Sequence, residues 1–214
     1  MKIIRSNRRS ICLEITPEAV LIVRVPERVP QSYIEKLVQE KADWIQKKIA
    51  AAKNRPRAQE KSFVDGEGFF FLGKSYPLKI TRAKKIELTD ELIFPEKFLP
   101  KAKNKLEVWY KQEARKIISA RAEIFAEKMG LKFAAVKINS AQKRWGSCSR
   151  KNHLNFGWKL ILQPLELVDY VIVHELAHIP HKNHSRVFWQ LVAEYCPEFK
   201  VYRKRLREDR VCWF

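Results

Sequence analysis

The chain has 214 residues, and its 43 lysines and arginines against 24 aspartates and glutamates give a formal net charge of +19. Hydrophobic residues make up 46% of the chain and aromatic residues 11%, which is enough to build a core and excludes a disordered basic tail. No apolar run approaches the roughly 18 residues that a membrane-spanning helix needs, so we expect no membrane span.

The first half of the chain combines alternating apolar residues, which are typical of half-buried strands, with one stretch of helical spacing. Proline and glycine mark the turns between these segments. The expected elements are, in chain order, a β-hairpin over residues 10–24, a helix over residues 32–49, a basic connector over residues 53–61, a second hairpin over residues 69–78 with Gly73-Lys74 at its turn, and a short strand over residues 86–94. We therefore predict that residues 1–100 form a β-rich region with one helix.

The second half of the chain alternates strands with longer helices. Its expected elements are a long amphipathic helix over residues 106–129 that ends at Gly130, strands over residues 136–140 and 154–162 that are joined by a loop, and helices over residues 165–178, 185–195 and 198–207. Strands followed by helices in this order predict an α+β fold, with residues 101–214 as its second domain.

The segment from His174 to His178 has the sequence His-Glu-Leu-Ala-His. Two histidines four residues apart lie on one face of a helix, so both imidazoles can reach one metal ion. Glu175 is directed toward the same ion, where it can take a proton from bound water. The flanking residues are apolar, and buried histidines and glutamate without a metal would carry a large desolvation cost. The motif predicts a metal-dependent hydrolase, although the same spacing also arises by chance in helices that hold no metal.

A hydrolytic zinc site needs three protein ligands and an open position for water. Pro180 is expected to end the helix near His178, after which the chain can turn back toward the metal. His184 is the favoured third ligand, because four of the chain's five histidines fall within residues 174–184. His181 and Glu198 are the alternatives: His181 sits in the tight turn, and Glu198 has the spacing of zinc proteases with a glutamate as third ligand.

Further motifs accompany the histidines in a fixed order. They are Arg-Trp-Gly-Ser-Cys-Ser at residues 144–149, Asn-Phe-Gly-Trp at residues 155–158, and Phe188-Trp189 after the third histidine. Together with the N-terminal hairpin, the segment Lys-Ala-Asp-Trp-Ile at residues 41–45 and Tyr76-Pro77-Leu78, this set resembles the YgjP-like metallopeptidase-domain family over nearly the whole chain.

The resemblance implies a zincin-like metallohydrolase domain over residues 101–214, related to the WLM and SprT groups. It implies one Zn²⁺ ion held by His174, His178 and His184, with Glu175 as the general base. The spacing is also similar to that of the metzincins, but His181 stands where they have glycine, and no methionine follows the motif.

The segment at residues 144–149 has two interpretations. Arg144 or Trp145 could line a substrate cleft, and an edge strand there could pair with an extended peptide. Alternatively, the segment forms a tight turn with Trp145 and Cys148 in the core, which we favour for these two residues. We predict no nucleophilic role for Cys148, because the sequence offers it no base. Arg144 and Asn155 are the candidate substrate-binding residues.

Basic residues are concentrated beside the histidine motif. Residues 128–164 contain eight basic and no acidic residues, and a second basic cluster lies within residues 200–210. A basic rim around a metal cleft would raise the local concentration of an anionic substrate.

Three functions follow from these observations. The favoured one is a zinc-dependent peptidase, with another divalent metal as an alternative to zinc. The second is a metal-dependent hydrolase of phosphoanhydrides or nucleotides, whose basic residues would hold phosphate oxygens. The third is a nucleic-acid-binding module with a vestigial site. The expected partners are thus a peptide, a protein or a phosphate-containing substrate, with nucleic acid contacting the basic surface and no membrane.

The four cysteines are scattered, with no closely spaced pair, and no signal-length apolar segment opens the chain. We therefore expect reduced thiols and a cytoplasmic protein.

Overall fold

The computed structural model describes residues 1–16, 18–53, 61–141 and 144–208. Its fold is α+β, as expected, and its contacts separate into two units, Met1–Ala58 and Gln59–Phe214. Each unit has a hydrophobic core of its own. Within the described ranges, no helix combines the length and the apolar character that crossing a membrane requires.

The first unit is a three-stranded sheet with two helices. Its elements are β1 (Lys2–Ser6), β2 (Cys12–Ile15), β3 (Leu21–Pro26), α1 (Gln31–Glu40) and α2 (Ala42–Lys53). Strand β3 is central: it pairs antiparallel with β2, which confirms the expected hairpin, and parallel with β1, which was not expected. Alternate residues of β3 are buried, and α1 and α2 contribute Ile34 and Ile45 to the same core.

The helix expected over residues 32–49 is two helices. Lys41 ends α1 with φ −101° and ψ 13°, which are outside helical values. The break gives each short helix one buried isoleucine, Ile34 in α1 and Ile45 in α2. The expectation of one continuous helix was therefore wrong.

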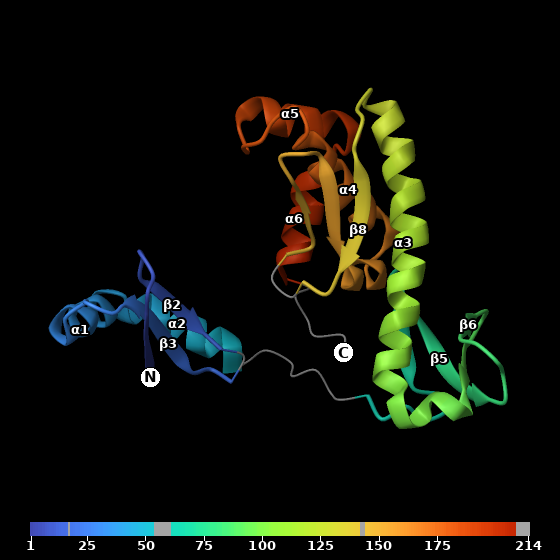
Figure 1. Cartoon of the computed structure of the whole chain (residues 1–214), viewed down its shortest axis with the longest axis horizontal. Coiled ribbons are helices and arrows are strands. Elements are labelled where there is room, and N and C mark those ends of the chain that lie inside the picture. Colours follow the sequence, from blue (N-terminus) through green and yellow to red (C-terminus); the bar gives the residue numbers. More distant parts are fainter. Residues whose placement is uncertain (17, 54–60, 142–143, 209–214) are drawn as a thin grey trace. The chain divides into compact units, whose positions relative to one another are not determined.

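The second unit contains two sheets and a long helix that runs beside both of them (Figure 1). Its elements are β4 (Gly68–Phe71), β5 (Lys74–Thr81), β6 (Glu87–Leu88), β7 (Leu92–Pro95), η1 (Glu96–Lys101), α3 (Ala102–Lys128), β8 (Ala135–Asn139), β9 (Gly146–Cys148), β10 (His153–Gly157), η2 (Trp158–Leu162), α4 (Leu165–Ala177), α5 (Arg186–Tyr195) and α6 (Phe199–Glu208). Helix α3 ends before Gly130, which has φ +63°, as the glycine predicted.

The four-stranded sheet has the order β4-β5-β7-β6. The β4–β5 turn consists of Leu72 and Gly73, both with positive φ, so it lies one residue earlier than expected. The single strand expected over residues 86–94 is the hairpin of β6 and β7.

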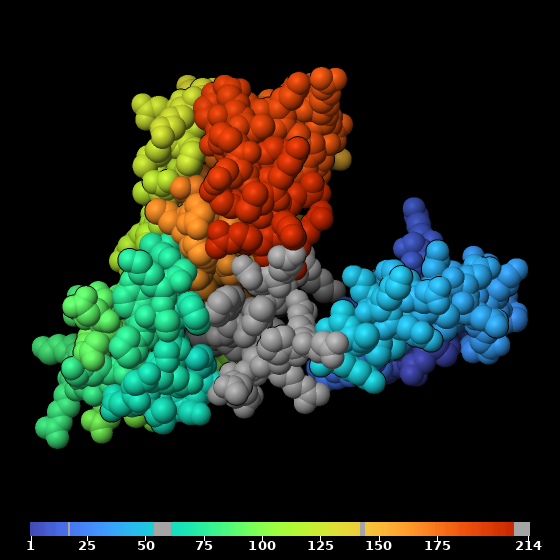
Figure 2. All heavy atoms as spheres, turned by 180° about the vertical axis from the view of Figure 1, so that it is seen from behind, coloured from blue at the N-terminus to red at the C-terminus, as the bar shows by residue number. Residues whose placement is uncertain are grey.

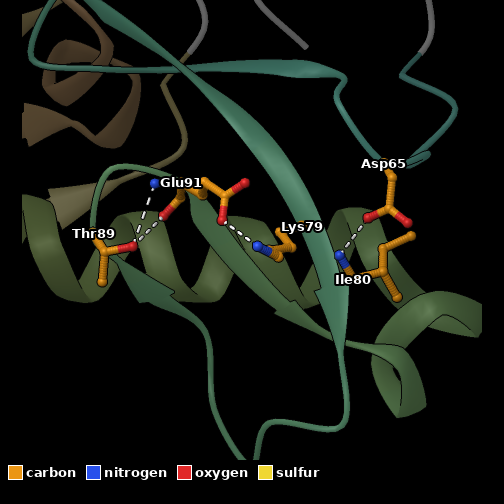
Figure 3. A network of polar contacts seen from close by, with 5 residues as sticks. All are labelled: Asp65, Lys79, Ile80, Thr89 and Glu91. Atoms are coloured by element: carbon orange, nitrogen blue, oxygen red, sulfur yellow. Dashed lines mark hydrogen bonds and ion pairs between the residues drawn. The ribbon is translucent and has the colours of Figure 1, made fainter.

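Polar contacts hold the strands of this sheet in register (Figure 3). Lys79 Nζ on β5 lies 2.8 Å from Glu91 Oε2, just before β7, and the backbone N–H of Ile80 donates to Asp65 Oδ1 at 2.6 Å. Thr89 Oγ1 caps the β6–β7 turn by hydrogen bonding with the backbone of Glu91.

The four-stranded sheet is attached to the rest of the second unit by hydrogen bonds. Tyr110 Oη on α3 donates to the carbonyl of Phe70 at 2.8 Å, and the N–H of Leu72 donates to the carbonyl of Ile161 at 2.8 Å. We expected the domain boundary after residue 100, whereas the contacts divide the chain after Ala58, because these bonds and a shared core join the sheet to α3 and η2.

The three-stranded sheet has the order β8-β10-β9, with β8 parallel and β9 antiparallel to the central β10. The strand expected over residues 154–162 ends at Gly157, where the chain continues as η2 with Trp158 buried. Strand β9 lies in the segment that was expected to be a loop. It forms one edge of the sheet.

Helix α4 is largely buried in the second unit. It contacts α3, α5, α6 and the edge strand β9 (Figure 1), and the C-terminal helices cover it on the face seen in Figure 2. Leu167, Val168, Ile172 and Leu176 on α4 are completely buried. The helix that carries the histidine motif is therefore held on several sides.

Candidate metal centre

Three histidines converge at the end of α4. Ligand atoms of His174, His178 and His184 all lie within 4.8 Å of one another, and they form the one such group of histidine, cysteine or acidic residues found in the described ranges. The Nε2 atoms of His174 and His184 are 3.1 Å apart.

This arrangement fits a zinc ion. Two nitrogens that each lie about 2.0–2.1 Å from one tetrahedral zinc are about 3.3–3.4 Å from each other, close to the separation between His174 and His184. Nearby, Glu175 Oε2 is buried without a hydrogen-bond partner among the described atoms. Three imidazoles are the donor set of a catalytic zinc site that keeps an open position, and the adjacent carboxylate would face water at that position.

A reversal of the chain brings His184 back to α4. The helix ends at Ala177 with His178 as its C-cap, and the N–H of His181 still donates to the carbonyl of Ala177 at 3.2 Å. Ser185 then caps α5, its side chain accepting a hydrogen bond from the N–H of Phe188. Helix α4 thus ends where Pro180 predicted, and the cap fixes the return of the chain immediately after His184.

The other two candidates for a third ligand have different roles. The backbone carbonyl of His181 lies 3.1 Å from His178 Nδ1. Because a carbonyl only accepts hydrogen bonds, Nδ1 carries the proton and Nε2 of His178 is left free to bind a metal. Glu198 accepts a hydrogen bond from Tyr202 Oη at 2.6 Å and is outside the histidine cluster.

Two aromatic rings pack against the imidazoles of the cluster. The ring of Phe188 is completely buried, 5.0 Å from that of His174 and 4.6 Å from that of His178. The ring of Trp189 stacks on His184 at 5.5 Å with an interplanar angle of 20°. Phe188 and Trp189 thus pack directly against the histidine cluster.

Burial keeps the three histidines neutral. It lowers the pKa of His174 to about 3, and the neighbouring His178, His184 and Arg203 further disfavour a positive charge there. Burial also lowers the pKa values of His178 and His184. Since a neutral imidazole is the form that binds a metal, the cluster is ready for metal at neutral pH.

Glu175 is buried beside the cluster, with 5% of its surface exposed. Burial raises its pKa to about 8, against the opposing effects of Arg144 and of a backbone hydrogen bond from Cys148. A carboxyl group with a pKa near neutrality is suited to accepting and returning a proton.

The edge strand β9 packs closely against the side chain of Glu175. A Cβ atom built on Gly146 would lie 2.7 Å from Glu175 Oε1 and 2.8 Å from its Cγ. A side chain at this position would therefore displace Glu175. The sequence contained this glycine within its 144–149 motif, but nothing in the sequence connected it with Glu175.

Two adjoining cavities open onto the site. The first, of about 260 Å³, is lined by the three histidines, Glu175, Lys182 and residues of β9. The second, of about 220 Å³, shares Gly146, His174 and Glu175 with the first. Its remaining lining residues are Arg144, Trp145, Tyr170, Val171, Arg203, Leu206 and Arg207.

Of the two predicted substrate-binding residues, Arg144 lines a cavity, and the side chain of Asn155 hydrogen-bonds within the sheet. Arg144 is exposed and lines the second cavity. Trp145 lines it too while packing on the core, and its Nε1 donates to the carbonyl of Leu206 at 3.3 Å. Asn155 lies on the central strand β10, where its amide donates to the carbonyls of Ser147 and His153 at 3.4 Å.

Cys148 lies on β9 with its thiol partly buried. Burial raises the pKa of Cys148, opposite to the change that a nucleophilic thiolate needs. Cys12, Cys148 and Cys196 are all free thiols, and Cys212 lies outside the described residues.

Comparison with known proteins gives one family. The sequence matches the family described as YgjP-like, metallopeptidase domain, over residues 9–209. Two solved structures are similar to part of the chain. The metallopeptidase zymogen of Pyrococcus abyssi abylysin is 20% identical, covers 44% of this chain and 97% of its own, and has a TM-score of 0.38. The metallopeptidase zymogen of Methanocaldococcus jannaschii jannalysin is 20% identical, covers 42% of this chain and 95% of its own, and has a TM-score of 0.36. Comparison with curated proteins finds no match.

Proposed function

The chain belongs to the YgjP-like metallopeptidase-domain family, and from this membership we propose that it is a zinc-dependent peptidase in which Glu175 acts as the general base. The observation that carries the proposal is the convergence of His174, His178 and His184 next to a buried glutamate. Three imidazoles would hold the metal, and the side of the cluster at the exposed His184 is open to water and substrate.

Zinc held by the three imidazoles would polarise the scissile carbonyl and lower the pKa of water at the site. Glu175 is protonated at neutral pH in the metal-free protein, and its pKa falls when a cation occupies the adjacent imidazoles. Its carboxylate then accepts a proton from the attacking water and delivers it to the leaving nitrogen. The backbone hydrogen bond from Cys148 and the close contact with Gly146 hold the carboxylate in place for both transfers.

Strand β9 is suited to hold a peptide substrate. It is an edge of its sheet, and its residues Gly146, Ser147 and Cys148 line the cavity of the histidine cluster. An extended peptide can add to such an edge as a further strand, with its backbone hydrogen-bonded beside the metal ligands. We infer that β9 positions the scissile bond.

The family membership favours peptide or protein substrates. Hydrolysis of phosphoanhydrides and binding of nucleic acid stay predictions from the distribution of charge. Zinc as the metal stays a prediction from the histidines, and a cytoplasmic location stays a prediction from the cysteines and the absence of a signal-length apolar segment.

Metal depletion followed by reconstitution tests the proposal. The chelated full-length protein is incubated with zinc or with other divalent metals, and each form is tested on a mixed peptide library and on a nucleotide panel, with products identified by mass spectrometry. We expect peptide cleavage that disappears with the metal and returns with it. Nucleotide hydrolysis without cleavage of any peptide would contradict the peptidase.

A further inference from the structure

A second cavity, which we call the arginine pocket, adjoins the histidine cluster. It is lined by Arg144, Arg203 and Arg207 and encloses about 220 Å³. It shares Gly146 and Glu175 with the cavity of the metal ligands. A group in this pocket would therefore lie beside the bond that is being cleaved.

The three arginines come from two separate elements. Arg203 and Arg207 are one turn apart on α6 and so lie on one face of this helix. Arg144 reaches the pocket from the chain two residues before β9. Apolar surface from Trp145, Tyr170, Val171 and Leu206 completes the lining.

These arginines have no anionic partner in the described part of the chain. Glu175 is the one acidic residue among the described residues that line the pocket, and it belongs to the metal site. Arg205, on another face of α6, pairs with Glu166 at 3.4 Å, whereas no ion pair is found for Arg203 or Arg207 among the described residues. The pocket thus gathers positive charge that the fold itself does not neutralise there.

The arginine pocket directly adjoins the metal site. His174 and Glu175 line it together with the three arginines. The guanidinium of Arg203 also lies over the ring of Trp189, 4.7 Å from its centroid, which fixes its position beside the cluster.

We propose that the arginine pocket is a substrate subsite for a carboxylate of the peptide next to the scissile bond. This inference rests on the proposed peptidase function. Guanidinium groups bind planar carboxylates through paired, charge-assisted hydrogen bonds. The volume of about 220 Å³ suits one side chain or a chain end, since pockets for whole small molecules measure about 300–1,000 Å³.

The carboxylate has two sources that an experiment can separate. An aspartate or glutamate side chain would act at a fixed distance from the cleaved bond, wherever it lies in the substrate. An α-carboxylate would restrict cleavage to bonds near the C-terminus of the peptide. Peptides with glutamate or glutamine at each position, each made with a free or an amidated C-terminus, distinguish the two sources.

The test measures kcat/KM on this peptide series for the full-length zinc-loaded protein and three variants. We expect wild type to prefer the carboxylate over its amide by at least about tenfold, the size of one charge-assisted hydrogen bond. Arg203→Gln and Arg207→Gln should reduce this ratio toward one, because KM rises for the acidic peptide. Arg205→Gln, on the same helix but paired with Glu166, is the matched control and should keep the wild-type ratio.

Binding of uncleaved peptides separates the subsite from the chemistry. Zinc-loaded Glu175→Gln should bind the acidic peptide more tightly than its amide, and the additional Arg203→Gln change should abolish the difference. This result without cleavage by wild type would refute the peptidase and leave the subsite standing. Equal affinity for acidic and amide peptides, or a stronger preference for a phosphorylated peptide, would overturn the subsite as a carboxylate site.

Discussion

The Nε2 atoms of His174 and His184 lie 3.1 Å apart, although one residue is on helix α4 and the other follows the turn after it. Burial lowers the pKa of both imidazoles, so neither is held as a cation that would repel the other. Two neutral nitrogens at this separation can direct their lone pairs at one ion. This pair defines the candidate metal centre and its third ligand.

Loss of His184 is expected to weaken zinc binding strongly. His184→Ala leaves two imidazoles, and zinc affinity should fall by more than about 100-fold, which exceeds the usual effect of losing a group that only orients a ligand. His181→Ala is the matched control, because it retains the backbone carbonyl that accepts from His178 Nδ1. Competition with a chromogenic chelator measures both affinities. Equal losses in the two variants would remove His184 from the ligand set.

A methyl group at position 146 is expected to impair catalysis without removing the metal. In Gly146→Ala the new Cβ would meet Glu175 Oε1 at 2.7 Å, so the carboxylate must move. We expect kcat/KM to fall by about 100-fold, the scale of a displaced catalytic group, while zinc content stays at one ion per chain.

Gly130→Ala provides the control for that substitution. Gly130 has φ +63° at the end of α3, away from both cavities, so alanine there should cost about 1–2 kcal/mol of stability. Its melting temperature should fall while kcat/KM is unchanged. If Gly146→Ala had full activity, the close packing of β9 on Glu175 would have no catalytic importance.

The metal-free protein should show the raised pKa of Glu175 in its stability. Because the folded-state pKa of about 8 lies above the ordinary value of 4.5, the folded state binds more protons than the unfolded state between these pH values. The contribution of Glu175 to stability is therefore fully present below pH 4.5 and is lost as the pH rises through 8.

Denaturant unfolding of chelated wild type and Glu175→Gln measures this effect. The free energy of unfolding of the variant should rise relative to that of wild type by about 1.4 kcal/mol per pH unit between pH 4.5 and pH 8. The difference should reach a few kcal/mol and stay constant above pH 8. A difference that does not vary with pH would show that Glu175 is not held in a protonated form.

The second unit is expected to hold the metal without the first. All three histidines, Glu175 and both cavities lie within Gln59–Phe214, and the cores of the two units share no residue. A fragment of residues 59–214 should bind one zinc ion with the affinity of the whole chain, as measured by isothermal titration calorimetry. Failure of a folded fragment to bind zinc would show that residues 1–58 contribute to the site.

Local patterns in the sequence predicted most of the secondary structure. The helix of the histidine motif, the helix expected over residues 185–195 and the glycine after α3 have signals within a few residues, and each lies where it was expected. The break at Lys41 and strand β9 had no such signal, because tertiary packing decides them. A short strand whose glycine must fit against a glutamate from another element is invisible to periodicity.

Only part of the candidate site could be predicted from the sequence, because the rest of it depends on tertiary packing. The spacing of His174 and His178 is a property of one helix, and Pro180 indicated the turn that returns His184. The sequence showed that residues 200–210 are basic, but α6 alone does not reveal which of its arginines face the site. Arg203 and Arg207 join Arg144 there, whereas Arg205 pairs with Glu166.

The central claim is tested most directly by comparing zinc-loaded wild type and Glu175→Gln for metal content and peptide hydrolysis in the same preparation. We predict one zinc ion per chain in both proteins and a kcat that is lower by about 10²- to 10⁴-fold in the variant, the range for loss of a general base. Equal rates of peptide hydrolysis at equal zinc content would contradict the assignment of Glu175 and with it the proposed mechanism.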